Sequence, residues 1–203
     1  QKYPEDFDAI LAGAPANYQT HLHTWDLSVS APVLNNAAAI VPPATLTMVT
    51  NAAIQACDAK DGVVDKLINN PRACSFDVAA LQCKVGESEN CLTAPQVEAM
   101  RRVYQPARTA SGQVIFPGKE PGSEYQWSAF VGGTVQGVSV GSFQVAHGDP
   151  NWDPKTFDIA RDLPLVDEKV GPTVNAINPD LRAFKARGGK LLLYHGWNDT
   201  AIS

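Results

Sequence analysis

The sequence has no apolar segment long enough to cross a lipid bilayer. A membrane-spanning helix needs about 20 consecutive apolar residues, and the longest apolar run here, near Leu191–Tyr194, is far shorter. The chain also has no excess of positive charge, since its formal net charge is -5. Without a basic stripe there is no electrostatic basis for binding nucleic acid. A membrane or a nucleic acid is therefore not expected as a partner, and 44% hydrophobic with 18% charged residues describes an ordinary globular chain.

The first residues do not form a secretory signal peptide, since Gln1–Pro4 has neither a basic start nor an apolar core. A mature, processed or truncated chain is expected to begin in this way. The chain also lacks the Cys-x-x-Cys and His-x-x-x-His spacings of zinc sites. Its four cysteines permit three pairings, of which Cys57–Cys74 with Cys83–Cys91 is the local one, and nested or crossed pairings stay open. Disulfides favour a secreted, extracellular or periplasmic protein.

An acidic loop lies between the first two cysteines. Its three carboxylates are spaced three and four residues apart: Asp58, Asp61 and Asp65. Gly62 permits a sharp turn among them, because glycine adopts positive φ without steric cost. Calcium takes six to eight oxygen ligands from carboxylates and backbone carbonyls, and two carbonyls alternate with the carboxylates here: those of Val63 and Leu67. The loop therefore predicts a structural Ca²⁺ site, with a solvated acidic turn in which Asp58 caps a short helix as the alternative.

The two ends of the chain share an α/β character. In residues 1–17 a short apolar strand, Phe7–Ala12, leads into Gly13. In residues 173–203 a helix begins near Asn178, stops at Gly188 and is followed by the apolar strand Leu191–Tyr194. A helix between two buried strands is typical of a parallel crossover unit. We therefore predict that both ends belong to one α/β core.

Residues 18–172 differ in character and read as an inserted cap, or lid, that is rich in loops and tied by disulfides. Two helices are predicted inside it, one over Pro42–Ala56 and one from Thr93 to Tyr104. One face of the second helix is expected to carry four residues: Val97, Met100, Arg101 and Tyr104. Glycine-rich and proline-rich segments separate these helices. No internal repeat is visible.

Asp199 follows the last apolar strand, where parallel sheets carry catalytic groups. In α/β-hydrolases the order along the chain is nucleophile, acid, histidine, and Asp199 fits the acid. A Gly-x-Ser-x-Gly pattern occurs at Gly137–Gly141, but it lacks the flanking strand and helix of a nucleophile elbow, so we expect a flexible cap loop there. The histidines offer no general base, since each lies in the irregular region or before the acid: His21, His23, His147 and His195.

Four segments together resemble the tannase/feruloyl esterase family of secreted serine esterases, which includes mono(2-hydroxyethyl) terephthalate hydrolase: QKYPEDFDAILAGAPA, the Cys57–Cys74 loop, DPNWDPKTFD and LLLYHGWND. The resemblance spans nearly the whole chain in the right order. It implies an α/β-hydrolase core, partial in this chain, with a large lid inserted before the strand that carries the acid.

The resemblance also implies roles for individual residues. Asp199 matches the triad aspartate, and five residues match a structural calcium site: Asp58, Asp61, Val63, Asp65 and Leu67. The cysteines match two lid disulfides, Cys57–Cys74 and Cys83–Cys91. The family's serine and histidine would lie outside this sequence, which would make the chain an internal fragment that is inactive alone.

The expected activity of the complete enzyme is hydrolysis of a small aromatic ester, feruloyl, galloyl or similar, through an acyl-enzyme. Three aromatic residues are candidates to line its pocket, although packing is the more ordinary role: Trp127, Phe143 and Trp152. The sequence fixes neither the exact ester nor the oligomeric state. Two alternatives remain, a non-catalytic secreted binding module stabilised by calcium, and an esterase that uses Ser139.

Overall fold

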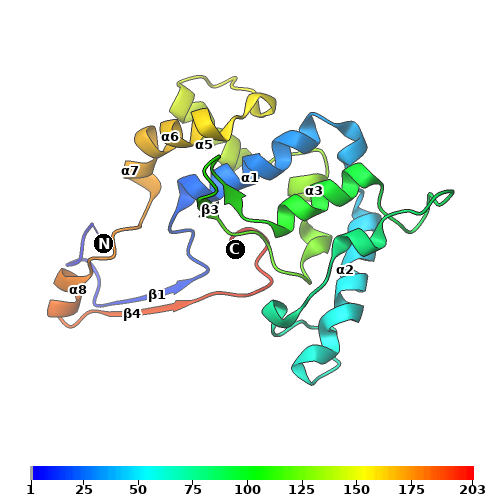
Figure 1. Ribbon diagram of the computed structural model, residues 1–203. Helices are drawn as coiled ribbons and strands as arrows, with labels where there is room; N and C mark the ends of the chain where they lie inside the picture. Colours follow the sequence, from blue (N-terminus) through cyan, green and yellow to red (C-terminus); the bar gives the residue numbers. More distant parts are fainter. Residues whose placement is uncertain (1) are drawn as a thin grey trace.

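The computed structural model describes residues 2–203, with a helical body that includes a short antiparallel pair of strands and, beside it, a parallel pair of strands (Figure 1). The α-helices are α1 (Gln19–Leu34), α2 (Pro43–Cys57), α3 (Ala94–Tyr104), α4 (Ser128–Val131), α5 (Gly137–His147), α6 (Ile159–Lys169), α7 (Gly171–Val174) and α8 (Arg182–Ala186). The strands are β1 (Ala9–Gly13), β2 (Ala107–Arg108), β3 (Val114–Phe116) and β4 (Lys190–Tyr194). Among residues 2–203, no helix has both the length and the hydropathy to cross a membrane.

The two ends of the chain meet in one parallel sheet, as the sequence predicts. Strands β1 and β4 pair from Ala9 opposite Lys190 to Gly13 opposite Tyr194, and they lie side by side at one edge of the molecule (Figure 1). Helix α8 precedes β4 and ends at Ala186, and Gly188, with φ +87°, follows its C-cap Arg187. The chain thus has the mixed α/β architecture expected from its sequence.

The expectation that both strands are buried is wrong for this chain. All five residues of β4 are exposed, and Leu11 on β1 is 67% exposed. The physical reason is that these two strands pair only with each other in the described part of the chain. Their apolar sequence is typical of strands covered on both faces, yet residues 2–203 supply little cover.

Helix α1 forms the centre of the helical body and packs against α3, α4, α5 and α6. Eleven of its sixteen residues are buried. Trp25 on this helix is completely buried and meets Phe130 of α4 edge to face, with 5.1 Å between ring centroids. The sequence does not predict α1, because its buried positions mix polar and apolar residues and Pro32 lies inside it.

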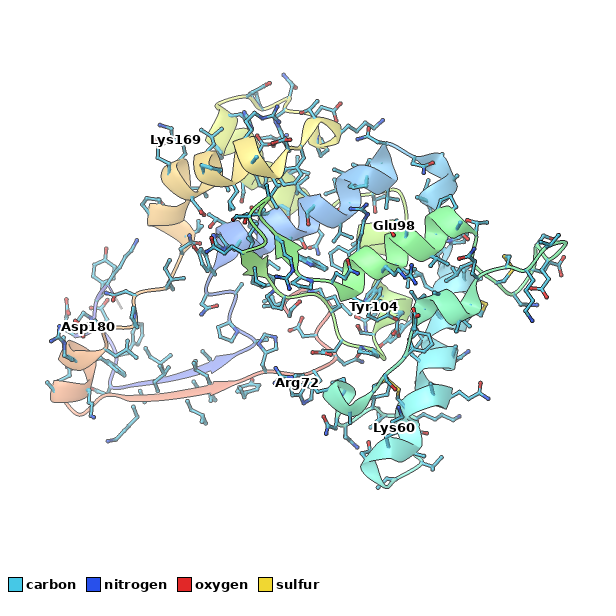
Figure 2. All side chains as sticks on the ribbon, viewed as in Figure 1. Lys60, Arg72, Glu98, Tyr104, Lys169 and Asp180 are labelled. Atoms are coloured by element: carbon cyan, nitrogen blue, oxygen red, sulfur yellow. A yellow bond between two sulfur atoms is a disulfide. The ribbon has the colours of Figure 1, made fainter. Side chains whose placement is uncertain are left out.

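The structure confirms the two helices that the sequence predicts near Pro42–Ala56 and Thr93–Tyr104. Pro43 is the first residue of α2, where its missing N–H costs nothing. Thr93 and Gln96 form a reciprocal capping box at the start of α3. Figure 2 labels Glu98 and Tyr104 on this helix, of which Glu98 is exposed and Tyr104 is half-buried.

One of the four residues predicted to share a face of α3 differs from Val97 and Met100, which are buried. Arg101 is exposed and its guanidinium lies 3.8 Å from the carboxylate of Asp77. Val103 is buried beside Met100 instead. A charged guanidinium stays in water because its desolvation without a buried partner is costly.

The segment Gly137–Gly141 is helical, so the expectation of a flexible loop is wrong. It forms the first part of α5, which ends at His147 and is capped by Gly148 with φ +65°. Ser139 and Phe143 on α5 are fully buried, and the helix packs on α1 and α6. Tertiary packing of this kind supplies most helical stability in proteins, which overrides two glycines in a short helix.

A buried carboxylate joins α1 to α5. The Ser139 hydroxyl donates a hydrogen bond to Asp26 Oδ2, while Asp26 Oδ1 has no hydrogen-bond partner among the described residues. Burial raises the pKa of Asp26 to about 7, although the Ser139 hydrogen bond and the positive charge of Lys119 act in the opposite direction. The folded protein therefore holds a proton on Asp26 that the unfolded chain releases near pH 4.

We expect this group to make the protein less stable as the pH rises from about 4 to about 7. Asp26 binds its proton more tightly in the folded state, so its contribution is complete below its unfolded pKa and is lost as the pH passes its folded pKa. Asp26→Asn stays uncharged, and should reduce the loss of Tm between pH 5 and pH 7.5 by an amount on the order of 5 °C. Differential scanning calorimetry at the two pH values measures Tm. Exposed Asp6→Asn is the control, and an equal pH dependence in wild type and Asp26→Asn would contradict the assignment.

Candidate functional site

The end of β4 leads directly into the loop that carries Asp199. The N–H of Ala14, just after β1, donates to the carbonyl of Tyr194 at 2.8 Å, which joins the carboxyl ends of the two strands. In parallel sheets this edge is where ligands and catalytic groups lie. We call residues His195–Ser203 the acid loop.

The acid loop fixes one oxygen of the Asp199 carboxylate, while the other accepts no hydrogen bond from residues 2–203. Asp199 Oδ1 accepts the N–H groups of Ala201 at 2.9 Å and Ile202 at 2.8 Å. The Asp199 N–H donates to the carbonyl of Gly196 at 3.2 Å. Oδ2 lies 3.6 Å from His195 Nε2, beyond hydrogen-bond length. An ionised carboxylate held in this way can accept a hydrogen bond from an imidazole.

His195 is not placed as a partner of Asp199. Its Nε2 lies 2.9 Å from the carbonyl oxygen of Ile202, which engages the ring within the acid loop. His195 therefore closes the loop, in agreement with its position before the acid in the sequence.

Lys119 is a buried cation near the acid loop that the sequence does not single out. Lys119 is 3% exposed, and its Nζ lies 4.7 Å from the centroid of the Trp25 ring, with no hydrogen-bond partner among residues 2–203. Burial lowers the pKa of Lys119 to about 8, and the carboxylates of Asp26 and Asp199 partly oppose that change. Lys119 is thus within electrostatic reach of Asp199. Its sequence context, a loop rich in glycine and proline, holds no signal of this burial.

A small cavity of about 310 Å³ adjoins the acid loop. Its lining includes Pro15 beyond β1, Phe116 on β3, and His195 and Ile202 of the acid loop. The three aromatic residues considered as pocket candidates do not line it: Trp127, Phe143 and Trp152. They belong to the buried core, where Phe143 stacks on Trp152 with 5.3 Å between centroids. The structure therefore agrees with packing, the more ordinary role expected for these three residues.

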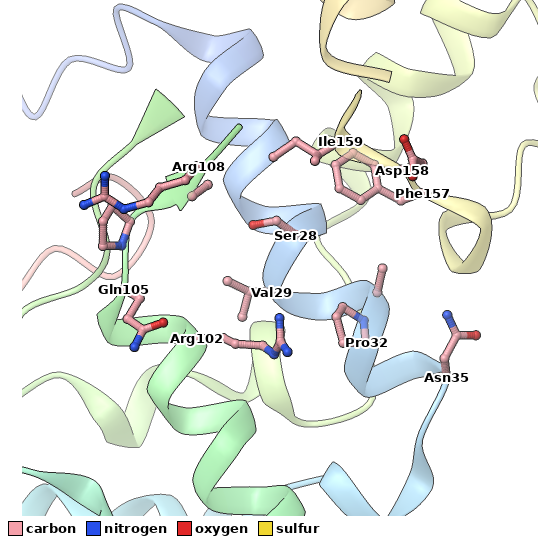
Figure 3. A pocket seen from close by; sticks show the side chains of 13 residues that line it. Ser28, Val29, Pro32, Asn35, Arg102, Gln105, Arg108, Phe157, Asp158 and Ile159 are labelled. Atoms are coloured by element: carbon pink, nitrogen blue, oxygen red, sulfur yellow. The ribbon is translucent and has the colours of Figure 1, made fainter. Parts of the chain in front are cut away.

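Two further cavities lie away from Asp199. One of about 410 Å³ lies between α1 and α3, with Arg102 and Arg108 on one side and Phe157 and Asp158 on the other (Figure 3). The other, of about 860 Å³, lies against the sheet and is lined partly by Ile10, Leu191 and Leu193. Neither includes a residue of the acid loop.

The histidines and Ser139 do not form a second catalytic group. Ser139 is fully buried on α5 with its hydroxyl bound to Asp26. The nearby His23 instead places Nδ1 2.7 Å from the hydroxyl of Ser142. The other two lid histidines meet carboxylates of α6 at 3.1 Å: His21 with Asp167 and His147 with Asp162. No serine–histidine–aspartate arrangement results from these contacts.

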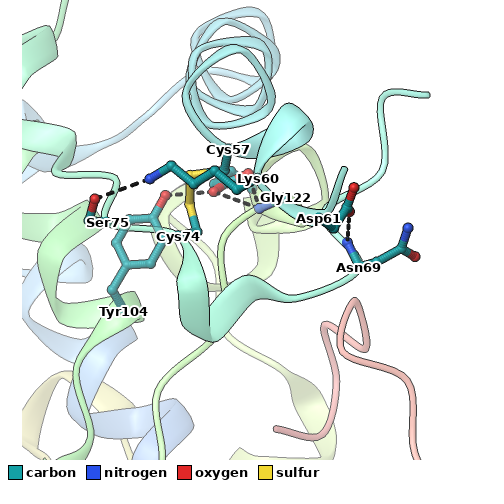
Figure 4. Close-up of a disulfide and its surroundings, with 9 residues drawn as sticks. Cys57, Lys60, Asp61, Asn69, Cys74, Ser75, Tyr104 and Gly122 are labelled. Carbon is teal, nitrogen blue, oxygen red and sulfur yellow. Dashed lines mark hydrogen bonds between the residues drawn. A yellow bond between two sulfur atoms is a disulfide. The ribbon is translucent and has the colours of Figure 1, made fainter. Parts of the chain in front are cut away.

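Both local disulfides are present, Cys57–Cys74 and Cys83–Cys91. The first closes the acidic loop at the end of α2 (Figure 4). Gly62 has φ +95°, which confirms its expected role in the turn. Lys60 Nζ donates to the hydroxyl of Ser75 at 3.2 Å across the base of the loop.

The carboxylates of the acidic loop accept backbone N–H groups of the loop itself. Asp58 Oδ1 accepts from residues 65 and 66, Asp61 from residues 63 and 69, and Asp65 from residue 67. The hydrogen bonds from Val63 and then Asn69 lower the pKa of Asp61. Asp58 is a loop-closing acceptor here, so the alternative in which it caps a short helix is wrong.

The oxygen donors of this loop suit calcium in kind, but its carboxylates do not form a metal-binding group in the described part of the chain. Within residues 2–203, no three side chains of His, Cys, Asp or Glu form a group that could hold a metal ion. Figure 4 shows Asp61 directed toward Asn69. Two of the five expected ligands, Val63 and Leu67, are more than half exposed. In this arrangement the loop is closed by its own hydrogen bonds, and the calcium site stays a prediction.

The whole chain, residues 1–203, matches the family model described as tannase and feruloyl esterase. The chain belongs to the tannase and feruloyl esterase family. A probable feruloyl esterase B-1 of Aspergillus flavus is 32% identical over 209 residues, which cover 100% of this chain and 39% of that protein. An uncharacterized esterase of Xanthomonas campestris is 33% identical over 226 residues, covering 100% of this chain and 38% of that protein.

Solved structures agree with this assignment. Feruloyl esterase B from Aspergillus oryzae superposes with a TM-score of 0.91 at 31% identity, covering 100% of this chain and 41% of that one. Tannin acyl hydrolase from Aspergillus niger has a TM-score of 0.70 at 21% identity and shares the fold, over 99% of this chain and 41% of its own. The chain thus spans about two fifths of the length of the relatives it matches.

We expect Ser139 to be unreactive toward an alkyl fluorophosphonate. Its hydroxyl is buried and donates to Asp26, so a reagent that needs an exposed nucleophile has no access to it. Intact-mass spectrometry of the 203-residue chain should show no adduct, with or without calcium. An adduct mapped to Ser139 would make Gly137–Gly141 the nucleophile segment and contradict the structure.

Proposed function

We propose that this chain is the central part of a serine carboxylic ester hydrolase that acts on esters of phenolic or other aromatic acids, such as feruloyl or galloyl esters. The observation that supports this most is the Asp199 carboxylate just beyond the carboxyl end of β4, with Oδ1 held by two backbone amides and Oδ2 free of hydrogen bonds from the described part of the chain. Membership of the family agrees with it.

In the proposed reaction, a serine attacks the ester carbonyl and forms an acyl-enzyme that water then hydrolyses. A histidine takes the serine proton and gives it to the leaving alcohol. Asp199 accepts a hydrogen bond from that histidine, which fixes its tautomer and stabilises its charged form. The serine and the histidine would come from segments outside residues 1–203, so the chain alone would be inactive.

We propose residues 18–172 as the lid over this site, between core segments 1–17 and 173–203. The lid approaches the acid loop at Gln126, whose Oε1 accepts a hydrogen bond from the Thr200 hydroxyl at 3.0 Å. The cavity beside His195 and Ile202 is the part of the substrate site that this chain would form. Two disulfides support secretion or a periplasmic location.

Asp199→Asn should lower kcat about 10³- to 10⁴-fold with little change in KM. The amide can hold the wrong histidine tautomer, while contacts to the substrate remain. The assay uses a polypeptide that joins this chain to the family's flanking segments and follows release of ferulic or gallic acid from a methyl ester. Asp180→Asn, an exposed change in the same core segment, should leave kcat unchanged. Full activity in Asp199→Asn would exclude Asp199 as the triad acid.

We also propose that the acidic loop binds a structural calcium ion through carboxylates of Asp58, Asp61 and Asp65 and the carbonyls of Val63 and Leu67. Its support is the oxygen-only donor set on a glycine turn closed by a disulfide. Because the three carboxylates bond to loop amides in this structure, binding would require their side chains to turn toward a shared point.

Calcium at about 100 times its Kd should raise Tm by about 5–10 °C over chelated protein, because a ligand of the folded state alone stabilises that state. Asp61→Asn should abolish this increase. Glu89→Gln, an exposed acidic residue in the other disulfide loop, should retain it. An identical Tm in calcium and in chelator for the wild type would show that the acidic turn binds no structural ion.

A further inference from the structure

The loop closed by the Cys57–Cys74 disulfide, called the disulfide-closed loop below, contacts the acid loop through the guanidinium of Arg72. The guanidinium carbon of Arg72 lies 5.0 Å from the centroid of the Trp197 ring, and Figure 2 shows Arg72 beside the C-terminal segment. A guanidinium over an indole face is attracted by the negative face of the ring. Trp197 lies two residues before Asp199, so this contact acts on the acid loop itself.

We propose that Arg72 is a positioning residue for Asp199, because it holds Trp197 and thereby the part of the acid loop that presents the carboxylate. The inference rests on the proposed function, in which Asp199 orients a catalytic histidine. It extends that function because the disulfide-closed loop, through Arg72, would help to position the Asp199 carboxylate for the reaction.

Arg72 is held on a rigid base. It lies in the 3-10 turn η3 (Pro71–Ala73), in which the N–H of Cys74 donates to the carbonyl of Pro71 at 3.0 Å. Pro71 is buried, and Cys74 is bonded to Cys57 at the end of α2. The guanidinium thus extends from a backbone that is fixed by a disulfide, a buried proline and a closed turn.

A second contact holds the acid loop on the other side of Asp199. The Thr200 hydroxyl donates to Gln126 Oε1 at 3.0 Å, and Gln126 lies in the 3-10 turn η5 (Glu124–Gln126). That turn is anchored by the buried Glu124, which accepts a hydrogen bond from the Tyr104 hydroxyl at 2.6 Å. Residues 197 and 200 are therefore both tied to the lid, and the carboxylate lies between them.

The structure shows why such ties matter for the carboxylate. Asp199 is oriented by hydrogen bonds to Ala201 and Ile202, which lie within the acid loop. These bonds fix the side chain relative to its own loop, while the ties at 197 and 200 fix the loop relative to the lid. Loss of the Arg72 contact should lower kcat about two- to five-fold, the effect of an exposed cation–π pair, with KM nearly unchanged.

Fluorescence quenching by neutral acrylamide tests the contact without any need for activity. Trp197 is 49% exposed, whereas the other three tryptophans, Trp25, Trp127 and Trp152, are 0%, 0% and 8% exposed. Arg72→Ala should therefore increase the quenching constant of the 203-residue chain, and Trp197→Phe should remove that increase. Lys60→Ala, which removes a cation from the same disulfide loop, should leave quenching as in the wild type. Equal quenching in Arg72→Ala and wild type would overturn the inference.

Kinetics of the polypeptide that includes the flanking segments test the positioning role. Arg72→Ala should lower kcat, Arg72→Lys should restore part of it because an ammonium also binds an indole face, and Lys60→Ala should match the wild type. Raised quenching with an unchanged kcat in Arg72→Ala would show a contact without a positioning role. If wild type and Lys60→Ala are also inactive, the proposed function has failed, and the inference fails with it.

Discussion

Burial of helix α1 is the constraint on which the helical body depends. The helix crosses that body, and α3, α4, α5 and α6 all pack on it. Its buried surface is partly polar, so α5 and α6 meet specific hydrogen-bonding groups of α1 as well as apolar side chains. Ser139 of α5 meets Asp26, and Asp167 of α6 accepts a hydrogen bond from Thr20 at 2.5 Å. Because an unsatisfied buried polar group is costly, these pairs fix how the neighbouring helices are placed.

The acid loop depends on two separate parts of the chain. The parallel pairing of β1 with β4 brings its start to the edge where catalytic groups lie, and the side chains of Arg72 and Gln126 contact its later residues Trp197 and Thr200. The family relationship and the fold explain the pairing of β1 with β4. The contacts at Trp197 and Thr200 are made by side chains of this chain, and the contact at Trp197 links the disulfide-closed loop to the proposed catalytic acid.

Patterns in the sequence predict elements correctly where local chemistry decides the structure. The capping box at Thr93 and the proline at the start of α2 set helix ends through interactions within a few residues. Prediction fails for α1, where polar and apolar residues are buried together and no amphipathic period exists. It fails again for Gly137–Gly141, because packing of Phe143 in the core outweighs the glycines.

The sequence by itself determined the family, the parallel sheet formed by the two ends of the chain, and the position of Asp199 just beyond β4. These three features follow from local motifs and from the short apolar strands, which predict the same local structure whatever packs around them. Only the tertiary structure decided that Ser139 is buried and that Trp127, Phe143 and Trp152 belong to the core. It alone placed Arg72 over Trp197 and Lys119 near Asp199. These contacts join residues far apart along the chain, and packing of the whole molecule sets such distances.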